Sequence, residues 1–185
     1  MSRRRFVILD RDGTLIVERN YLSSPDGVQL LPEVLTGLGL LQELGLGLVV
    51  ITNQSGIGRG YFDMLRVEAI HARMNELLAT GGVKLDGIYC CPHLPEDHCS
   101  CRKPSPGLLL RAALEHDFAP EECIVIGDKP CDITLGRAVG AITILVTTGY
   151  GASFAASGTT ADAIVEDFGL AARFVRTRMS IPPPT

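Results

Sequence analysis

The chain has 185 residues, 46% of them hydrophobic, and a formal net charge of −4. This length allows one well-buried core and little more, so we expect a single domain over residues 1–178 and a flexible tail over 179–185. The composition argues against a disordered chain, and the negative net charge argues against nucleic acid as a partner.

The sequence has no apolar segment long enough to cross a bilayer. Arginines at 3–5 precede only four apolar residues, too few for the core of a signal peptide. We therefore expect a cytoplasmic protein that has no membrane partner. Thiols stay reduced in that compartment, so the six cysteines are expected to bind metal or to pack rather than to form disulfides.

Continuous apolar segments alternate with helical patterns along the whole chain. Strands that are apolar throughout are buried on both faces, and their alternation with helices indicates right-handed crossovers in a parallel sheet. The sequence therefore predicts an α/β fold with a doubly wound parallel sheet. In chain order we expect a strand at 6–9, a helix at 32–44 with Pro32 in its first turn, a strand at 46–51, a helix at 63–79, a strand at 87–90, a helix at 106–116, a strand at 123–126, a helix at 133–139, a strand at 142–146, a loop at 149–160, an edge strand at 163–165 and a helix at 169–179.

Two acidic residues, Asp10 and Asp12, follow the first predicted strand in the motif Asp-Arg-Asp-Gly-Thr. Parallel sheets bind ligands at the carboxyl ends of their strands. Side chains two residues apart also point the same way while the chain is extended. The repulsion between two such acids is relieved by a cation or by a shared proton. The motif therefore indicates magnesium binding, acid–base chemistry or both, and an acidic turn is the structural alternative.

Three further polar segments lie near the ends of later predicted elements. Residues 52–55 follow the second strand, residues 102–104 precede a helix, and residues 127–129 follow the fourth strand. Each alone is typical of an ordinary loop. Together they converge on the sheet edge where Asp10 lies, which favours one shared site.

The order D-x-D-G-T, strand-T-N, K-P and G-D-x-x-x-D resembles the haloacid dehalogenase superfamily of phosphotransferases over most of the chain. Cys-Pro-His at 91–93, Cys-Ser-Cys at 99–101 and the segment 53–60 resemble the branch that contains heptose bisphosphate 7-phosphatase and histidinol-phosphate phosphatase. This resemblance implies a phosphatase. Segments 53–60 and 85–89 favour removal of the 7-phosphate from D-glycero-D-manno-heptose 1,7-bisphosphate, on the route to nucleotide-activated heptose for cell-surface polysaccharide.

The resemblance also implies a mechanism in which a carboxylate attacks the phosphomonoester and water hydrolyses the resulting aspartyl-phosphate. It makes Asp10 the nucleophile, and it makes Asp12 the proton carrier of both half-reactions. It places Mg²⁺ on Asp10, the backbone carbonyl of Asp12 and Asp128, because a hard cation offsets the repulsion between carboxylate and phosphate. The Thr52 hydroxyl and the Lys103 charge are expected to stabilise the transferring phosphoryl group. Asp132 stays outside the metal shell as a supporting or helix-start carboxylate.

The cysteine-rich loop after the third predicted strand offers three thiolates and an imidazole within eleven residues, a set that suits Zn²⁺. Cys90 and His98 are alternative ligands by residue type, and the resemblance to the family pattern selects four others. Four protein ligands leave no open position for water, so Zn²⁺ is expected to be structural and to order Arg102 and Lys103. The selected ligands are Cys91, His93, Cys99 and Cys101, which leaves Cys123 and Cys131 as structural residues.

Family members of this size lack a separate cap domain, and the segments 12–32 and 52–103 leave no room for one. Short loops are therefore expected to bind a small phosphorylated sugar, with its second phosphate near Arg102 or Lys129. We expect the protein to act as a monomer. The substrate-binding residues that the resemblance implies are Glu18, Arg19, Asn20, Tyr21, Asn53, Gln54, Ser55, Arg102 and Lys129.

Two alternatives stay open at this point. Histidinol phosphate is the first, because the five residues between His93 and Cys99 form the short version of the loop that the histidinol branch also shows. The second is an inactive, zinc-stabilised binding module on the same fold. An inactive relative has no chemical need for the complete catalytic set, which argues against this second alternative.

Overall fold

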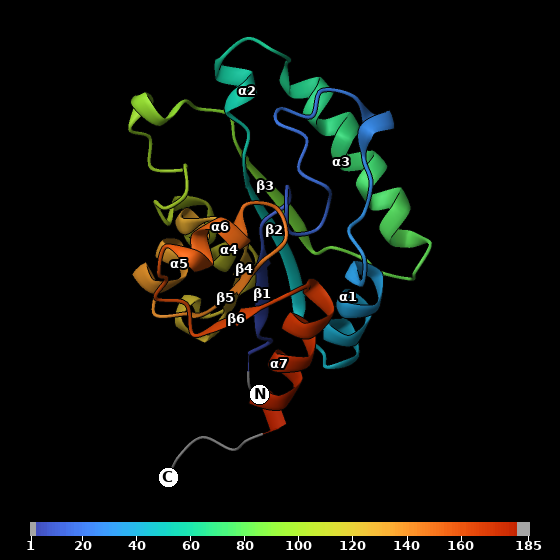
Figure 1. The fold of residues 1–185 in the computed structure, drawn as a ribbon, viewed down its shortest axis with the longest axis vertical. Helices are drawn as coiled ribbons and strands as arrows, with labels where there is room; N and C mark the ends of the chain where they lie inside the picture. Colours follow the sequence, from blue (N-terminus) through green and yellow to red (C-terminus); the bar gives the residue numbers. More distant parts are fainter. Residues whose placement is uncertain (1–2, 181–185) are drawn as a thin grey trace.

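The computed structural model describes residues 3–180 as a six-stranded parallel sheet flanked by helices, with strand order β3-β2-β1-β4-β5-β6 (Figure 1). This arrangement confirms the predicted doubly wound α/β fold. The strands are β1 (Phe6–Leu9), β2 (Gly47–Asn53), β3 (Gly87–Cys91), β4 (Ile124–Gly127), β5 (Ile142–Val146) and β6 (Ala163–Val165). The α-helices are α1 (Val34–Glu43), α2 (Ser55–Gly58), α3 (Met64–Ala79), α4 (Gly107–His116), α5 (Pro130–Ala138), α6 (Gly151–Ala156) and α7 (Phe168–Ser180), and short 3-10 helices are η1 (Pro25–Gly27), η2 (Pro95–Asp97) and η3 (Pro120–Glu122).

Alternate side chains of the central strands enter two separate cores. Val7 and Leu9 of β1 pack in the core that also holds the buried residues of α1, α3 and α7. Phe6 and Ile8 pack in the core on the other face, with the buried residues of α4 and Leu135 of α5. Every residue of β1 is therefore buried, as its continuous apolar sequence predicts.

The structure differs from the predicted elements at several helix boundaries. Pro32 precedes α1, because Glu33 has a left-handed backbone with φ of 62° and the helix begins only after it. Helix α5 begins at Pro130, three residues before the predicted start, and the Asp132 carboxylate accepts the N–H of Lys129 at its first turn. The predicted loop 149–160 contains α6.

The predicted tail 179–185 overlaps the end of the last helix. Met179 and Ser180 belong to α7, whose buried residues pack against the sheet and α1. Residues 181–185 lie outside the described residues. No helix within residues 3–180 is both long and apolar enough to cross a membrane.

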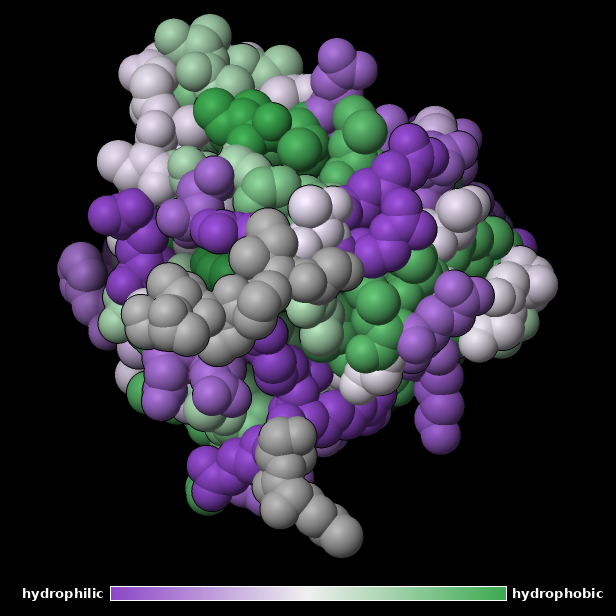
Figure 2. Space-filling model, turned by 90° about the horizontal axis from the view of Figure 1, so that it is seen from below, coloured by the Kyte–Doolittle hydropathy of each residue, from purple (hydrophilic) through white to green (hydrophobic). Residues whose placement is uncertain are grey.

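The carboxyl ends of β1, β2 and β4 meet at one edge of the sheet. In the register, Leu9 lies between Val50 of β2 and Ile126 of β4, and the backbone N–H of Asp10 donates to the carbonyl of Ile126 over 3.0 Å. The residues that follow these strands therefore gather at the same edge. The opposite end, where the strands begin, is seen from below in Figure 2, and hydrophilic and hydrophobic residues are interspersed on it.

Truncating Leu38 of α1 tests how far packing of α1 on the sheet stabilises this fold. Leu38 is fully buried, so Leu38→Ala is expected to lower the free energy of unfolding by about 2–5 kcal/mol. The matched control Leu114→Ala removes a leucine of α4 that is 85% exposed and should change it by less than about 0.5 kcal/mol. Urea denaturation measures both, and equal effects would contradict this packing.

Candidate active site

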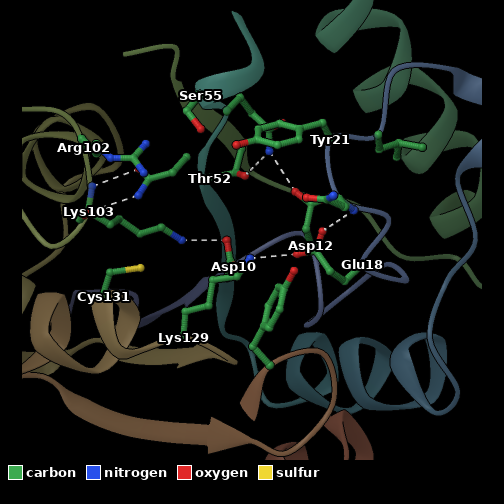
Figure 3. A pocket seen from close by; sticks show the side chains of 15 residues that line it. Asp10, Asp12, Glu18, Tyr21, Thr52, Ser55, Arg102, Lys103, Lys129 and Cys131 are labelled. Atoms are coloured by element: carbon green, nitrogen blue, oxygen red, sulfur yellow. Dashed lines mark hydrogen bonds and ion pairs between the residues drawn. The ribbon is translucent and has the colours of Figure 1, made fainter. Parts of the chain in front are cut away.

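A cavity of about 230 Å³ lies at the carboxyl ends of β1, β2 and β4 (Figure 3). Both carboxylates of the Asp-x-Asp motif line it, together with residues from the loops that follow the other two strands and from the cysteine-rich loop. The polar segments that sequence analysis places at one edge therefore do share one cavity. Its lining consists of Asp10, Asp12, Glu18, Asn20, Tyr21, Leu22, Thr52, Asn53, Gln54, Ser55, Arg102, Lys103, Lys129, Cys131 and Tyr150.

The Lys103 ammonium group is buried against Asp10. Its Nζ lies 2.7 Å from Asp10 Oδ1 and 2.7 Å from Asp132 Oδ1, and it donates to the carbonyl of Ile51 over 2.6 Å. Burial alone would lower the pKa of Lys103, but Asp10 and Asp132 raise it well above its ordinary value. Burial likewise opposes ionisation of Asp10, but Lys103 and Lys129 lower the pKa of Asp10 below its ordinary value. Asp10 is therefore held as the carboxylate, the form that acts as a nucleophile.

The backbone of Lys103 is held by the Asn53 side chain at the end of β2. The Asn53 Nδ2 group donates to the Lys103 carbonyl over 3.0 Å, and the Lys103 N–H donates to Asn53 Oδ1 over 3.0 Å. Asn53 also lines the cavity. Its side-chain amide group is hydrogen-bonded to the Lys103 backbone, so in this structure it positions Lys103.

Asp12 and Thr52 are joined by Gln54. The Gln54 Nε2 group donates to Asp12 Oδ2 over 2.8 Å and to Thr52 Oγ1 over 2.7 Å (Figure 3). Because Thr52 accepts this bond, its own hydroxyl hydrogen can be donated elsewhere. Gln54 therefore orients two of the predicted catalytic residues.

Asp128 lies at the end of β4 and is completely buried. Its Oδ2 accepts the Tyr150 N–H over 2.8 Å, whereas Oδ1 has no hydrogen-bond partner among residues 3–180. Burial, followed by repulsion from Asp10, raises the pKa of Asp128 to about 8. A buried carboxylate with an unpartnered oxygen is stabilised when it binds a proton or a cation.

The carboxylates around this point fit a magnesium ion. Oxygens of Asp10, Asp128 and Asp132 lie within 4.8 Å of one another, and Mg²⁺ prefers oxygen ligands. Both oxygens of Asp132 are engaged, Oδ1 by Lys103 and Oδ2 by the Lys129 N–H, whereas Asp10 contacts Lys103 through Oδ1 and Asp128 keeps an unpartnered Oδ1. That Asp132 stays outside the metal shell remains a prediction.

Two glycines allow the neighbouring loops to approach Asp128. Gly13 has a φ of +85° and Gly149 a φ of +55°, and a Cβ atom at either position would collide with the Asp128 carboxylate. The Thr148 hydroxyl links the two loops by donating to the Gly13 carbonyl over 2.6 Å. Gly13 of the Asp-x-Asp-Gly-Thr motif thus allows close packing on Asp128.

The predicted zinc ligands form a single cluster beside the cavity. Donor atoms of all four residues lie within 4.8 Å of one another, and the three sulfurs are 3.2, 3.4 and 3.6 Å apart. Sulfurs bound to one zinc at about 2.3 Å also lie less than about 4 Å apart, so this donor set fits a tetrahedral metal site. Neither Cys90 nor His98 belongs to the cluster. Its members are Cys91 at the end of β3, His93, Cys99 and Cys101.

Two residues that line the cavity, Lys129 and Glu18, form an ion pair. Lys129 Nζ lies 2.9 Å from Glu18 Oε2, and it also lies 5.2 Å from the centre of the Tyr150 ring. Burial would lower the pKa of Lys129, but Asp10, Asp128 and Glu18 raise it. Lys129 is therefore a cation that faces both the loop after β1 and the buried carboxylates.

The two arginines predicted to bind substrate differ in position. Arg102 lines the cavity and donates from Nη1 to the carbonyl of His93 over 3.2 Å, which ties it to the cysteine cluster. Arg19 does not line the cavity. Its side chain donates to the Gly27 carbonyl over 3.0 Å and to Gln29 Oε1 over 3.2 Å, so it stabilises the loop before α1.

Several residues near the cavity were not expected from the sequence. Leu22, Cys131 and Tyr150 line it, whereas Cys123 is buried in a core. The sequence gives Arg11 no role, although it occupies the middle position of the Asp-x-Asp motif. In the structure its side chain is completely buried and donates a hydrogen bond to Asp12.

Comparisons with known proteins identify similar sequences. A family model described as HAD-hydrolase-like matches residues 100–171. A D-glycero-beta-D-manno-heptose-1,7-bisphosphate 7-phosphatase from Helicobacter pylori is 39% identical over 137 residues, which cover 74% of this chain and 79% of the relative. A protein of the same name from Pseudomonas aeruginosa is 38% identical over 149 residues, which cover 80% of this chain and 84% of the relative.

The fold is also similar to a solved structure of this kind. The crystal structure of D,D-heptose 1,7-bisphosphate phosphatase from B. bronchiseptica, complexed with magnesium and phosphate, superposes with a TM-score of 0.88. The two sequences are 34% identical, and the match covers 94% of this chain and 99% of the other. The similarity therefore extends over nearly the whole of both chains.

Proposed function

The chain belongs to the D-glycero-D-manno-heptose-1,7-bisphosphate 7-phosphatase family of haloacid dehalogenase-like hydrolases, and we propose that it removes the 7-phosphate from that bisphosphate. It is a phosphatase. The observation that carries the proposal is a cavity with two carboxylates on its wall, Asp10 and Asp12, and a buried ammonium, Lys103, against the first. This set supplies a nucleophile, a proton carrier and a fixed positive charge in one place.

In the first half-reaction, the Asp10 carboxylate attacks phosphorus and the bond to the leaving oxygen breaks. Asp12 gives a proton to that oxygen, and the Thr52 hydroxyl donates to the transferring phosphoryl group. Lys103 offsets the negative charge that Asp10 and the phosphoryl group bring together. The products of this step are the heptose 1-phosphate and an aspartyl-phosphate on Asp10.

In the second half-reaction, Asp12 takes a proton from a water molecule that attacks the aspartyl-phosphate. The bond between phosphorus and Asp10 breaks, and inorganic phosphate and the free carboxylate result. One side chain therefore serves as acid and then as base, and it returns to its starting protonation state after each turnover.

Magnesium fits the carboxylates that the mechanism requires. Asp10, the backbone carbonyl of Asp12 and Asp128 would hold Mg²⁺, which would offset the repulsion between Asp10 and a phosphate dianion. The unpartnered Oδ1 of Asp128 supports this assignment, and so does the magnesium in the B. bronchiseptica structure. The ammonium groups of Lys103 and Lys129 would offset the remaining negative charge of the carboxylates and the phosphate.

We also propose that the cysteine cluster holds Zn²⁺ in a structural role. Three sulfurs and one imidazole nitrogen fill a tetrahedral shell, so no position is left for a reacting water. Cys101 directly precedes Arg102 and Lys103, and Arg102 donates to the carbonyl of the ligand His93. Zinc would thus hold in place the loop that supplies Lys103 to the cavity.

The substrate is bound by short loops rather than by a separate cap. The chain between β1 and α1 contains only η1, and the chain between β2 and β3 contains α2 and α3. Glu18, Asn20 and Tyr21 line the cavity together with Arg102 and Lys129. We assign the sugar hydroxyls to the first group and the second phosphate to the two cations, because both can pair with phosphate oxygens.

We propose that the enzyme acts as a monomer in the cytoplasm, on the route to nucleotide-activated heptose for surface polysaccharide. The substrate of this step is a small, highly charged sugar bisphosphate, which needs neither a membrane nor a nucleic acid partner.

Phosphate release from a substrate panel tests the function. With Mg²⁺, D-glycero-D-manno-heptose 1,7-bisphosphate is expected to be hydrolysed at least about 100-fold more efficiently, as kcat/KM, than histidinol phosphate, because only the bisphosphate engages the distal cations. Phosphorus NMR should show loss of the 7-phosphate and retention of the 1-phosphate. A preference for histidinol phosphate would overturn the assignment, and failure on every sugar phosphate would favour an inactive binding module.

Two substitutions test the division of labour between the carboxylates. Asp10→Asn is expected to abolish the acid-stable phosphoenzyme and turnover, because the nucleophile is lost. Asp12→Asn should still fold but lose about 10²–10⁴-fold in kcat, because proton transfer fails in both half-reactions. Rapid quench with ³²P-labelled substrate measures both, with the exposed Asp26→Asn as the matched control. Phosphoenzyme formed by Asp10→Asn would refute the assigned nucleophile.

Metal analysis tests the zinc proposal. Protein purified without added metal is expected to contain about one zinc per chain, and Cys99→Ser should lose it together with at least about tenfold in activity. The control Cys123→Ala removes a buried thiol that does not belong to the cluster and should keep the zinc. Wild-type protein free of zinc, or a zinc-free Cys99→Ser variant of full activity, would contradict the structural role.

A further inference from the structure

Arg11 is a completely buried cation that the mechanism above does not use. It stands between the two catalytic carboxylates in the sequence, and its guanidinium group is turned to only one of them. Arg11 Nε donates to Asp12 Oδ2 over 3.0 Å, and Arg11 Nη2 donates to Asp12 Oδ1 over 3.1 Å. This is a side-on, two-point contact of the kind that fixes a carboxylate plane.

The far side of the guanidinium group meets His71 of α3. Arg11 Nη1 and His71 Nε2 are 3.0 Å apart. Arginine has no acceptor atom, so Nε2 must be the unprotonated acceptor of this bond. Burial, and then the Arg11 charge, lowers the pKa of His71 to about 3, so the ring is neutral at ordinary pH.

These contacts distinguish the two oxygens of Asp12. Oδ2 accepts from Arg11 Nε and from Gln54 Nε2 and also lies 2.9 Å from Arg11 Nη2, whereas Oδ1 accepts from Arg11 Nη2 alone among residues 3–180. A carboxylate oxygen has two lone pairs in its plane, so both on Oδ2 are occupied and one on Oδ1 is open. The Asp12 side chain keeps 13% of its surface exposed, and it lines the cavity.

We propose that Arg11 and His71 are positioning residues for proton transfer, with His71 holding the guanidinium group side-on to Asp12 so that Oδ1 is the oxygen that carries the proton. The proton on Oδ1 passes to the leaving oxygen as the phosphorus–oxygen bond breaks. The same oxygen then takes a proton from the water that attacks phosphorus, so the Asp12 group is restored. Neither Arg11 nor His71 touches the substrate in either step.

The Arg11 side chain acts on Asp12 in particular and does not simply offset the total negative charge of the site. Asp10 already has the Lys103 ammonium group, and Asp12 receives a cation of its own from behind the cavity wall. Burying a guanidinium group is unfavourable unless it is paired on all sides. The neutral His71 ring supplies the acceptor that completes this pairing without adding charge.

A double-mutant cycle separates positioning from general damage. His71→Leu removes the acceptor, and it is expected to lower kcat for the bisphosphate about 10–100-fold and change KM by less than threefold. In the Asp12→Asn background the same substitution should change kcat by less than twofold, because the group through which His71 acts is already lost. His71→Gln, whose amide oxygen can accept from Arg11, should keep at least about a third of wild-type kcat.

The control Tyr89→Phe removes a hydrogen bond to Glu115 on the far side of the sheet and should leave kcat unchanged in both backgrounds. Circular dichroism checks the fold, and Arg11→Lys replaces His71→Leu in the cycle if that variant does not fold. Equal losses with and without Asp12, or an unchanged kcat in a folded His71→Leu variant, would overturn the inference.

The inference rests on the proposed function, but the two fail in different ways. If the wild-type enzyme leaves the heptose bisphosphate intact, the proposed substrate fails. The cycle is then run on the phosphomonoester that the panel shows to be hydrolysed. If the wild-type enzyme hydrolyses the bisphosphate and His71→Leu does so equally well, only the positioning role fails.

Discussion

The buried contact between Lys103 and two aspartates links the fold to the chemistry. The ammonium group bonds to Asp10 after β1, to the carbonyl of Ile51 in β2 and to Asp132 in α5. Buried charges are tolerated only when they are paired in good geometry, so the positions of these three elements depend on one another. Asn53 and the cysteine cluster hold the Lys103 backbone from two further directions. The electrostatics of the cavity and the packing of the sheet are thus stabilised by the same contacts.

The sequence predicts the central strands well because they are buried. The predicted bounds 6–9 and 142–146 match the observed strands, as expected for largely apolar segments in the middle of a sheet. The bounds 163–165 match as well, although this edge strand is partly exposed. Helix starts were harder to place. Nothing in Pro32 reveals that Glu33 takes a left-handed backbone, and α6 consists of small residues apart from Phe154, a composition that is equally compatible with a loop.

The candidate site likewise has parts that the sequence predicts and parts that it does not. Side chains in motif positions, such as Asp10, Thr52 and Lys103, converge as expected because strand ends meet at one edge. Contacts between segments that lie far apart in the sequence could not be predicted. Sequence spacing does not show that Asn53 binds the Lys103 peptide, that Arg19 turns away from the cavity or that His71 reaches Arg11. Those contacts depend on how α3 and the loops pack, which is a tertiary property.

The ion pair between Glu18 and Lys129 also affects how an anionic ligand would enter and leave. A phosphate that approached Lys129 would meet the Glu18 carboxylate already paired with it, so the phosphate would have to share this ammonium group with Glu18 or displace Glu18. The net electrostatic gain is smaller than an unpaired lysine would give, because the empty cavity is already partly neutralised. Because the Glu18 carboxylate would compete with a bound phosphate for Lys129, the ion pair would favour release of the anion after hydrolysis.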